Sequence, residues 1–350
     1  MHRLLLSLWV VQFTWAADPS IPPALPESVV TNRATIIVAH QTGATVAFTP
    51  GANAARQLVA LAFRAQSSDK TTATAWRSVL EPKDVVGFKV TSSPGPVAGT
   101  RPVVVRALIE SLREIGHPAT QIVIWDRRKT DLIEAGFARL AEELGVRCVG
   151  VDEAGWDDAK GYDSPVPGRL VHGDFEFGRR ESVSGGGILG RKSHATRLLT
   201  HDVTKIITVA PLLNHNQIGV NGHIASLGLG SVDNTLRFED SADRLAEALP
   251  EICALDEIFP KLALCVTDAM LCQYRGEERT LLHYAVATDE LWLSSDPVAL
   301  DTFALQELAF ARQRAPVDGE KPFKTEVYRN CELLELGVAD LKRIDLRRVP

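Results

Sequence analysis

Asp84-Val-Val-Gly-Phe-Lys-Val90 and Gln121-Ile-Val-Ile-Trp-Asp126 are two short apolar runs with the length of buried strands. Between them, residues 101–115 carry apolar side chains at helical spacing, and Pro102 suits the first turn of a helix. Thr100 is the predicted cap of this helix. A strand, a helix and a second strand in this order are typical of parallel strands joined by a crossover. We therefore predict a parallel sheet that is covered on both faces.

The same alternation continues on both sides of this unit. Further strands are predicted at residues 35–40, 147–151, 205–211, 262–267 and 291–294. Further helices are predicted at residues 54–65, 131–144 and 241–259, and another opens at residues 296–300. Residues 152–200 lose this rhythm, with a hairpin around His172 and a run Ser184-Gly-Gly-Gly187 that would suit a lid. The predicted fold class is α/β, with a mostly parallel sheet, helices on both faces and an irregular insertion at residues 152–200.

The N-terminus is typical of an export signal. A weakly basic start at residues 2–3 precedes an apolar run at residues 4–15, and a small-x-small-like site ends at Ala16. An uncleaved membrane anchor is the alternative, but the run is shorter than the roughly 20 residues of a membrane span. We predict a signal at residues 1–16, an extended proline-rich leader at 17–36 and a single α/β domain at 37–350. The expected location is periplasmic or extracellular, with no stable membrane span after signal removal.

Composition limits the classes of partner and cofactor. The 350-residue chain is 45% apolar and 23% charged, with a net charge of −6, which is typical of a globular protein. Lysine and arginine are scattered among carboxylates, so no nucleic-acid partner is predicted. The cysteines have no C-x-x-C spacing, and we expect mostly buried thiols, although an oxidising compartment permits one or two bridges. They are Cys148, Cys253, Cys265, Cys272 and Cys331.

Several short motifs occur together in the order seen in one group of microbial proteins. They are Val86-Gly-Phe-Lys89, Gly99-Thr-Arg-Pro102, Ile122-Val-Ile-Trp-Asp126, the loop at residues 211–230, and Ser295-Asp-Pro-Val-Ala-Leu-Asp301. In this order they resemble the domain-of-unknown-function 362 family over residues 83–308. The resemblance implies an α/β fold and, for many members, export, but no agreed activity. Some members carry a ferredoxin-like cysteine cluster, which this chain lacks, so no iron–sulfur cluster is expected.

This chain departs from the family pattern in the central loop. Many relatives place a lysine where this chain has Asn214, and a Lys-Asn pair where it has Ala225-Ser226. The loss of these cations weakens an anion-binding role carried over from the family. Lys89, Asp126 and Asp296 do match the pattern.

Four polar side chains lie at or just beyond predicted strand ends. They are Lys89, Asp126, His215 and Asp296. Because ligands of parallel sheets bind outside the carboxyl ends of the strands, these side chains could share one crevice. In this hypothesis Lys89 provides charge for a ligand, and His215 acts as acid or base or as a ligand. Either Asp126 or Asp296 is the supporting carboxylate. An ion pair between Lys89 and Asp126 explains both residues equally well without catalysis.

The loop after the strand at residues 205–211 supplies the remaining candidates. Amide side chains that could orient a ligand are Asn214, Asn216 and Asn221. His215 and His223, with Asp233 nearby, could hold a divalent metal, or they could hydrogen-bond the backbone of their own loop.

Thr100 and Asp296 are further candidate ligand-binding residues with structural alternatives. Thr100 ends the loop at residues 91–100 beside a predicted helix N-terminus, where anions can bind, although ordinary helix entry also explains it. Asp296 precedes Pro297 and suits a helix cap, while Asp301 could face the same cleft or solvent.

The functional hypothesis is an exported protein whose crevice binds a small polar or anionic ligand. A metal-assisted enzyme of unknown reaction is one form of this hypothesis. A non-catalytic solute-binding protein and a structural or interaction module are the alternatives.

Overall fold

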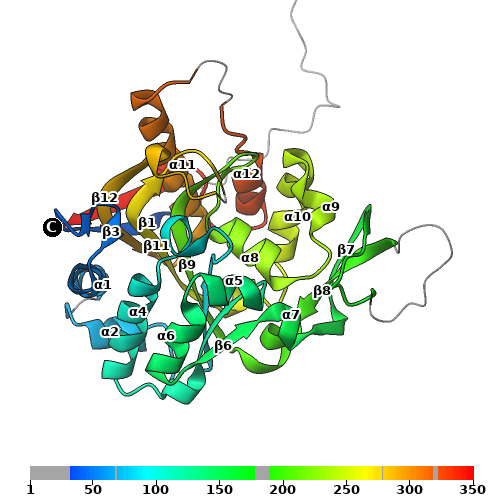
Figure 1. Cartoon of the computed structure of the whole chain (residues 1–350), viewed down its shortest axis with the longest axis horizontal. Coiled ribbons are helices and arrows are strands. Elements are labelled where there is room, and N and C mark those ends of the chain that lie inside the picture. Colours follow the sequence, from blue (N-terminus) through cyan, green and yellow to red (C-terminus); the bar gives the residue numbers. More distant parts are fainter. Residues whose placement is uncertain (1–31, 68, 178–188, 278, 318–321) are drawn as a thin grey trace, which may run out of the picture. The chain divides into compact units, whose positions relative to one another are not determined.

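The computed structural model has a nine-stranded sheet at its centre (Figure 1). Eight strands follow the order β13-β1-β12-β11-β9-β4-β5-β6, and β10 pairs with β9. The bounds are β1 (Ala34–His40), β4 (Val86–Val90), β5 (Ile122–Asp126), β6 (Arg147–Gly150), β9 (Lys205–His215), β10 (Gly219–Val220), β11 (Leu262–Gln273), β12 (Ala285–Ser294) and β13 (Ile344–Val349). Strand β12 is antiparallel to both neighbours, and the other pairings along the order are parallel. The predicted mostly parallel α/β fold is confirmed.

Helices cover both faces of this sheet and enclose two separate apolar cores. One core lies under α1 (Ala52–Gln66), α2 (Thr72–Arg77), α4 (Pro102–Glu114), α5 (Lys129–Glu134) and α6 (Phe137–Leu144). The other lies under α8 (His223–Ser231), α10 (Ala242–Cys253), α11 (Pro297–Arg314) and α12 (Glu326–Leu333). The remaining short elements are β2 (Thr45–Val46), β3 (Thr49–Pro50), α3 (Gly95–Ala98), α7 (Val151–Ala154) and α9 (Leu236–Glu239). Burial of both faces explains the continuous apolar runs of the central strands.

The structure describes residues 32–67, 69–177, 189–277, 279–317 and 322–350. Residues 33–350 form one compact unit, and its first strand already begins at Ala34. The domain therefore starts a few residues before the predicted boundary at 37. The predicted signal at residues 1–16 lies outside the described residues.

Two local predictions around the first crossover are wrong. The helix predicted at residues 131–144 is divided into α5 and α6, because Gly136 between them adopts a left-handed backbone with φ +87°. Thr100 does not cap α4, whose N-cap residue is Arg101. The Thr100 hydroxyl instead donates to the carbonyl of Val209 and accepts from the amide of Thr91.

The predicted insertion lies outside the main sheet. It contains a two-stranded antiparallel hairpin of β7 (Trp156–Arg169) and β8 (Leu189–Thr196), with His172 in the connection, as the sequence predicts. The run at residues 184–187, proposed as a lid, lies outside the described residues.

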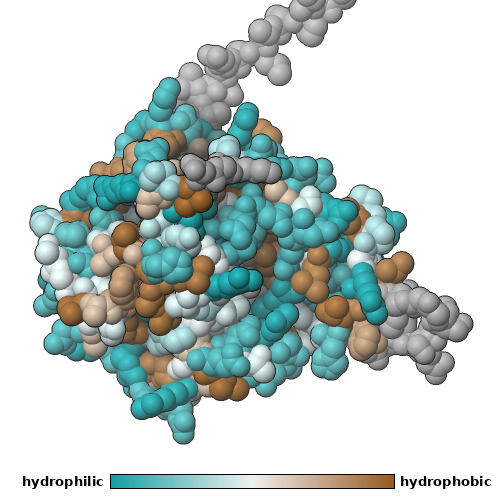
Figure 2. Space-filling view, turned by 45° about the horizontal axis from the view of Figure 1, so that its top comes forward, coloured by the Kyte–Doolittle hydropathy of each residue, from teal (hydrophilic) through white to brown (hydrophobic). Residues whose placement is uncertain are grey.

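The five cysteines are free thiols, and four of them are buried, as expected from their spacing. The bridges that an oxidising compartment permits are absent from this arrangement. The face shown in Figure 2 is largely hydrophilic with scattered hydrophobic side chains. Within the described part of the chain, no helix has the length and apolar character needed to cross a membrane.

Candidate ligand-binding site

A small pocket lies where the path of the chain changes direction across the sheet. From β4 the chain crosses to β5 on one side, whereas from β9, the other neighbour of β4, it continues to β11 on the opposite side. Parallel sheets bind ligands at the carboxyl ends of strands at such a switch point. The pocket has a volume of ≈ 140 Å³. Its lining comes from the ends of β4 and β5 and the residues after them, from Asn221 before α8, and from α8 and α9.

Lys89 forms the base of this pocket and is almost completely buried, at 1% exposed. Its Nζ atom donates to Oδ1 of Asp126 at 2.6 Å, to the carbonyl of Val90 at 2.8 Å and to Oγ of Ser226 at 3.0 Å. An ammonium group has three protons. All three are therefore used within the protein.

The Asp126 carboxylate is equally well satisfied. Its Oδ1 accepts from Lys89 and from the amide of Arg127 at 2.8 Å, while Oδ2 accepts from the amide and hydroxyl of Ser92 at 2.7 and 2.6 Å. A carboxylate offers about four lone-pair sites. The Lys89–Asp126 pair therefore has no capacity left for a ligand unless one of these bonds opens.

Burial shifts the pKa values of both Lys89 and Asp126 toward the neutral forms, and the charge of each partner opposes this shift. Burial lowers the pKa of Lys89, and the neighbouring Asp126 charge opposes this effect. Burial raises the pKa of Asp126, but the Lys89 charge and the hydrogen bonds from Lys89 and Ser92 outweigh it and hold the pKa below its ordinary value. The carboxylate is ionised, and the pair is stabilised by its mutual charge and hydrogen bonds.

Glycines allow α8 to lie close to β4 at Gly230 and allow the residue just before the helix, Gly222, to lie close to α11. A Cβ atom on Gly230 would lie 2.3 Å from Cε of Lys89, and one on Gly222 would lie 2.1 Å from Oδ1 of Asp301. Asp301 of α11 accepts from the amides of His223 and Ile224 at 2.8 and 2.9 Å. This buried carboxylate therefore fixes the start of α8, and with it the position of the helix over the pocket.

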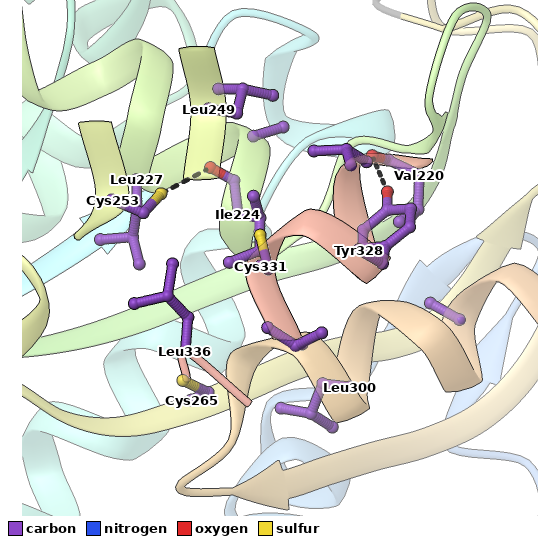
Figure 3. Packing of buried hydrophobic residues seen from close by; sticks show 14 of the residues in the cluster. Val220, Ile224, Leu227, Leu249, Cys253, Cys265, Leu300, Tyr328, Cys331 and Leu336 are labelled. Carbon is purple, nitrogen blue, oxygen red and sulfur yellow. Dashed lines mark hydrogen bonds between the residues drawn. The ribbon is translucent and has the colours of Figure 1, made fainter. Parts of the chain in front are cut away.

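The opposite face of α8 is packed into the apolar core. Figure 3 shows Ile224 and Leu227 of α8 near Leu249 and Cys253 of α10, with Cys331 of α12 beside them. The Cys253 thiol donates to the carbonyl of Ile224 at 3.5 Å. This packing explains why the α8 side of the pocket is rigidly placed.

Three polar groups of the pocket have hydrogen-bonding capacity left. Thr91 and Ser226 lie 3.2 Å apart between their hydroxyl oxygens, and only one of their two protons is used in that contact. Asn221, between β10 and α8, is 8% exposed and lines the pocket. Within the described residues, the side-chain amide of Asn221 has no hydrogen-bond partner. These groups are available to a ligand.

The rim carries charges of both signs. Nη1 of Arg127 donates to Oε1 of Glu239 at 2.8 Å, so these two charges neutralise each other. Arg128 is exposed at the rim, and Asp131 lies in the first turn of α5. The pocket is therefore polar, and its formal charges balance.

His215 and its neighbouring asparagines lie elsewhere, at the tip of β9. Nδ1 of His215 lies 3.5 Å from Oε1 of Glu277 and accepts from the amides of Gln217 and Ile218. Asn214 accepts from the amide of Glu277 at 3.0 Å, and Nδ2 of Asn216 donates to Glu277 at 2.6 Å. The prediction that these residues share the crevice with Lys89 is wrong, because their side chains tie the β9 tip to the turn after β11.

His223 is also committed to the protein interior. Its ring nitrogens lie 2.7 Å from Oγ1 of Thr208 and 3.0 Å from Oγ1 of Thr267, and burial lowers its pKa to about 3. Both nitrogens therefore have partners, and the structure does not bring His223 together with His215 as a metal-binding pair. No group of three or more histidine, cysteine or acidic side chains suited to a metal occurs among the described residues.

The remaining predicted ligand-binding residues, Thr100 and Asp296, have structural roles. Thr100 fastens the loop after β4 to β9. Asp296 caps α11 by accepting from the amide of Ala299 at 2.8 Å, and it also accepts from the amide of Val338 at 2.9 Å. Neither residue lines the pocket, and these structural contacts account for both residues.

The sequence prediction missed Ser226 and Gly230 as site-forming residues. It left Asp301 facing either the cleft or solvent, whereas Asp301 is buried against the start of α8. Ser226 and Gly230 occur in a run of small residues in α8, Ala225-Ser-Leu-Gly-Leu-Gly230, which permits close approach of another element. This run of small residues could have predicted the close packing of α8 from the sequence. The role of Asp301 depends on a contact between α11 and α8, and no local sequence pattern predicts that contact.

A larger hollow of ≈ 750 Å³ lies between α1, α4 and the ends of β1 and β13. None of the residues predicted from the sequence lines it. Arg56 and Glu110, on facing helices, form a weak ion pair at 3.7 Å there. It lacks a buried polar centre comparable to the Lys89–Asp126 pair.

No protein-family model and no curated protein match this chain. The resemblance to the domain-of-unknown-function 362 family therefore stays a prediction.

Proposed function

We propose that this protein binds a small polar or anionic ligand in the pocket above the Lys89–Asp126 pair. The observation that carries the proposal is the position of the pocket at the switch point of the sheet, where β4 and β5 deliver polar side chains to one crevice. Its base is a fixed buried ion pair, and its wall is a helix held by Asp301. A rigid polar pocket of this kind suits selective binding.

The size of the pocket limits the ligand. A cavity of about 150 Å³ holds a molecule the size of benzene. The pocket measures ≈ 140 Å³. It therefore takes a ligand of roughly six non-hydrogen atoms, or one group of that size from a larger ligand.

Binding is better supported than catalysis by the Lys89–Asp126 pair. A general base must accept a proton from the reacting group, and a lysine base must first be neutral. Here the ammonium has three acceptors, and the carboxylate has four donors. The pair thus acts as a scaffold for the pocket rather than as its acid and base.

A purely structural role of the site is the second candidate, because the saturated ion pair also favours it. A thermal-shift screen of the purified chain with metal ions, phosphorylated compounds and organic acids separates the two. Saturable stabilisation by one class of compound supports binding, and it should reach about 2.7 kcal/mol at a ligand concentration of 100 times the Kd. No response to any class supports the structural role.

A further inference from the structure

The protein groups with remaining capacity in the pocket can donate hydrogen bonds to a ligand. One proton of the Thr91–Ser226 hydroxyl pair is unused, because the pair shares a single hydrogen bond. Ser226 already accepts from Lys89, so its second lone pair is the one that faces Thr91. Thr91 therefore donates in that contact, and the Ser226 hydroxyl keeps its proton for the pocket.

Asn221 provides the second donor and the strongest sign of a ligand. Asn221 is 8% exposed as a residue, it lines the pocket, and its side-chain amide has no hydrogen-bond partner within the described residues. A ligand with acceptor oxygens would pair with the N–H groups of this amide.

The charge of the pocket distinguishes between classes of oxygen acceptor. Lys89 is neutralised by Asp126, and Arg127 is neutralised by Glu239. Arg128 remains as the exposed cation of the rim, with the acidic side chain of Asp131 in the same lining. With two of its three cations paired, the lining offers a ligand at most the one positive charge of Arg128. This suits a single negative charge better than a phosphate group, which carries a charge of about −1.5 to −2 at pH 7.

We infer that the pocket takes a small carboxylate, whose oxygens accept from Asn221, from a hydroxyl of the Thr91–Ser226 pair and from Arg128. The inference rests on the proposed binding function and deepens it by naming the chemical class and the contact residues. Arginine suits this role because its planar guanidinium matches the geometry of a carboxylate. The Lys89–Asp126 pair holds Ser226 in place but does not contact the ligand.

Calorimetric titration of the purified chain with glycolate and with glycolamide tests the carboxylate requirement. The two probes have the same number of non-hydrogen atoms and differ in charge. We expect glycolate to bind at least tenfold more tightly than glycolamide and more tightly than inorganic phosphate. Equal binding of glycolamide, or tighter binding of phosphate, would overturn the inference while leaving the proposed binding function intact. If no small polar probe binds, both the carboxylate inference and the proposed binding function are wrong.

Variants test the contact residues. Asn221→Asp keeps the shape but replaces donors by negative charge, and Arg128→Gln removes the rim cation, so each should weaken glycolate binding at least tenfold. Arg128→Gln should weaken glycolamide binding less than glycolate binding, because glycolamide has no charge to pair with the guanidinium. Arg329→Gln is the matched control, because Arg329 is exposed and does not line the pocket. Asn221→Ser replaces the aspartate variant if the latter does not fold. Unchanged glycolate affinity in a folded Asn221 variant would show that Asn221 does not contact the ligand.

Discussion

Gly230 and Lys89 are so close that a Cβ atom on the glycine would lie 2.7 Å from the Nζ atom of the lysine. The ammonium cannot easily move aside, because three hydrogen bonds fix it. The absence of a side chain at position 230 is therefore a condition for the buried ion pair and for the approach of α8 to β4.

Gly230→Ala should destabilise the protein by about 1–3 kcal/mol, the usual cost of forcing extra volume into a packed site. Urea unfolding of both proteins measures this change. Gly228→Ala is the control in the same helix, since its Cβ would meet Cδ2 of Leu249 at 2.5 Å, the end of a flexible side chain. Equal losses in the two variants would show that position 230 has no special relation to Lys89.

The two members of the buried Lys89–Asp126 pair should be energetically coupled. Lys89→Met and Asp126→Asn should each lower the free energy of unfolding by about 3–5 kcal/mol, because the first leaves an unpaired buried carboxylate and the second an unpaired buried ammonium. The double variant should lose clearly less than the two single losses combined. Additive losses in urea unfolding would contradict a coupled pair.

The exposed pair of Lys324 and Asp243, at 3.2 Å, provides the reference for this cycle. Lys324→Met should change the free energy of unfolding by less than about 1 kcal/mol, because solvent screens the pair.

Asp301 should make the protein less stable as the pH rises. Burial raises the pKa of Asp301 from 3.8 to about 7. Between these values the folded chain keeps a proton that the unfolded chain has lost, so stability falls from about pH 4 to pH 7, by up to about 4 kcal/mol. Asp301→Asn cannot ionise, and its stability relative to the parent should rise over this range.

Urea unfolding at several values from pH 5 to pH 8 measures the Asp301 effect. Asp345→Asn is the control, because the hydrogen bond and charge of Arg33 lower the pKa of the exposed Asp345, which then titrates below this range. If the curves of parent and Asp301→Asn remain parallel, the buried carboxylate does not titrate as described.

His215→Ala should leave glycolate affinity within about twofold of the parent, since His215 lies at the β9 tip and not in the pocket lining. It should lower stability modestly through the loss of the contacts with Gln217, Ile218 and Glu277. Calorimetric titration and urea unfolding measure the two effects separately. A loss of glycolate affinity without a loss of unfolding free energy would show that His215 belongs to the ligand-binding site.

Strand ends were the part of the site that could be predicted from the sequence. Lys89 and Asp126 both follow or end apolar runs, and the parallel pairing of β4 and β5 places them together. The same reasoning failed for His215 and Asp296. The strand β9 continues beyond Pro211 to His215, which carries the histidine past the crevice, and Asp296 is turned toward the start of α11.

The chain sequence by itself determined the α/β class, because continuous apolar runs alternating with amphipathic helices can be buried only in a sheet covered on both faces. It also determined which residues end the strands. Only the tertiary structure decided which polar groups keep unused hydrogen-bonding capacity. That property depends on partners from distant segments, such as Asp301 for α8 and Ser226 for Lys89, and no local pattern specifies where those segments meet.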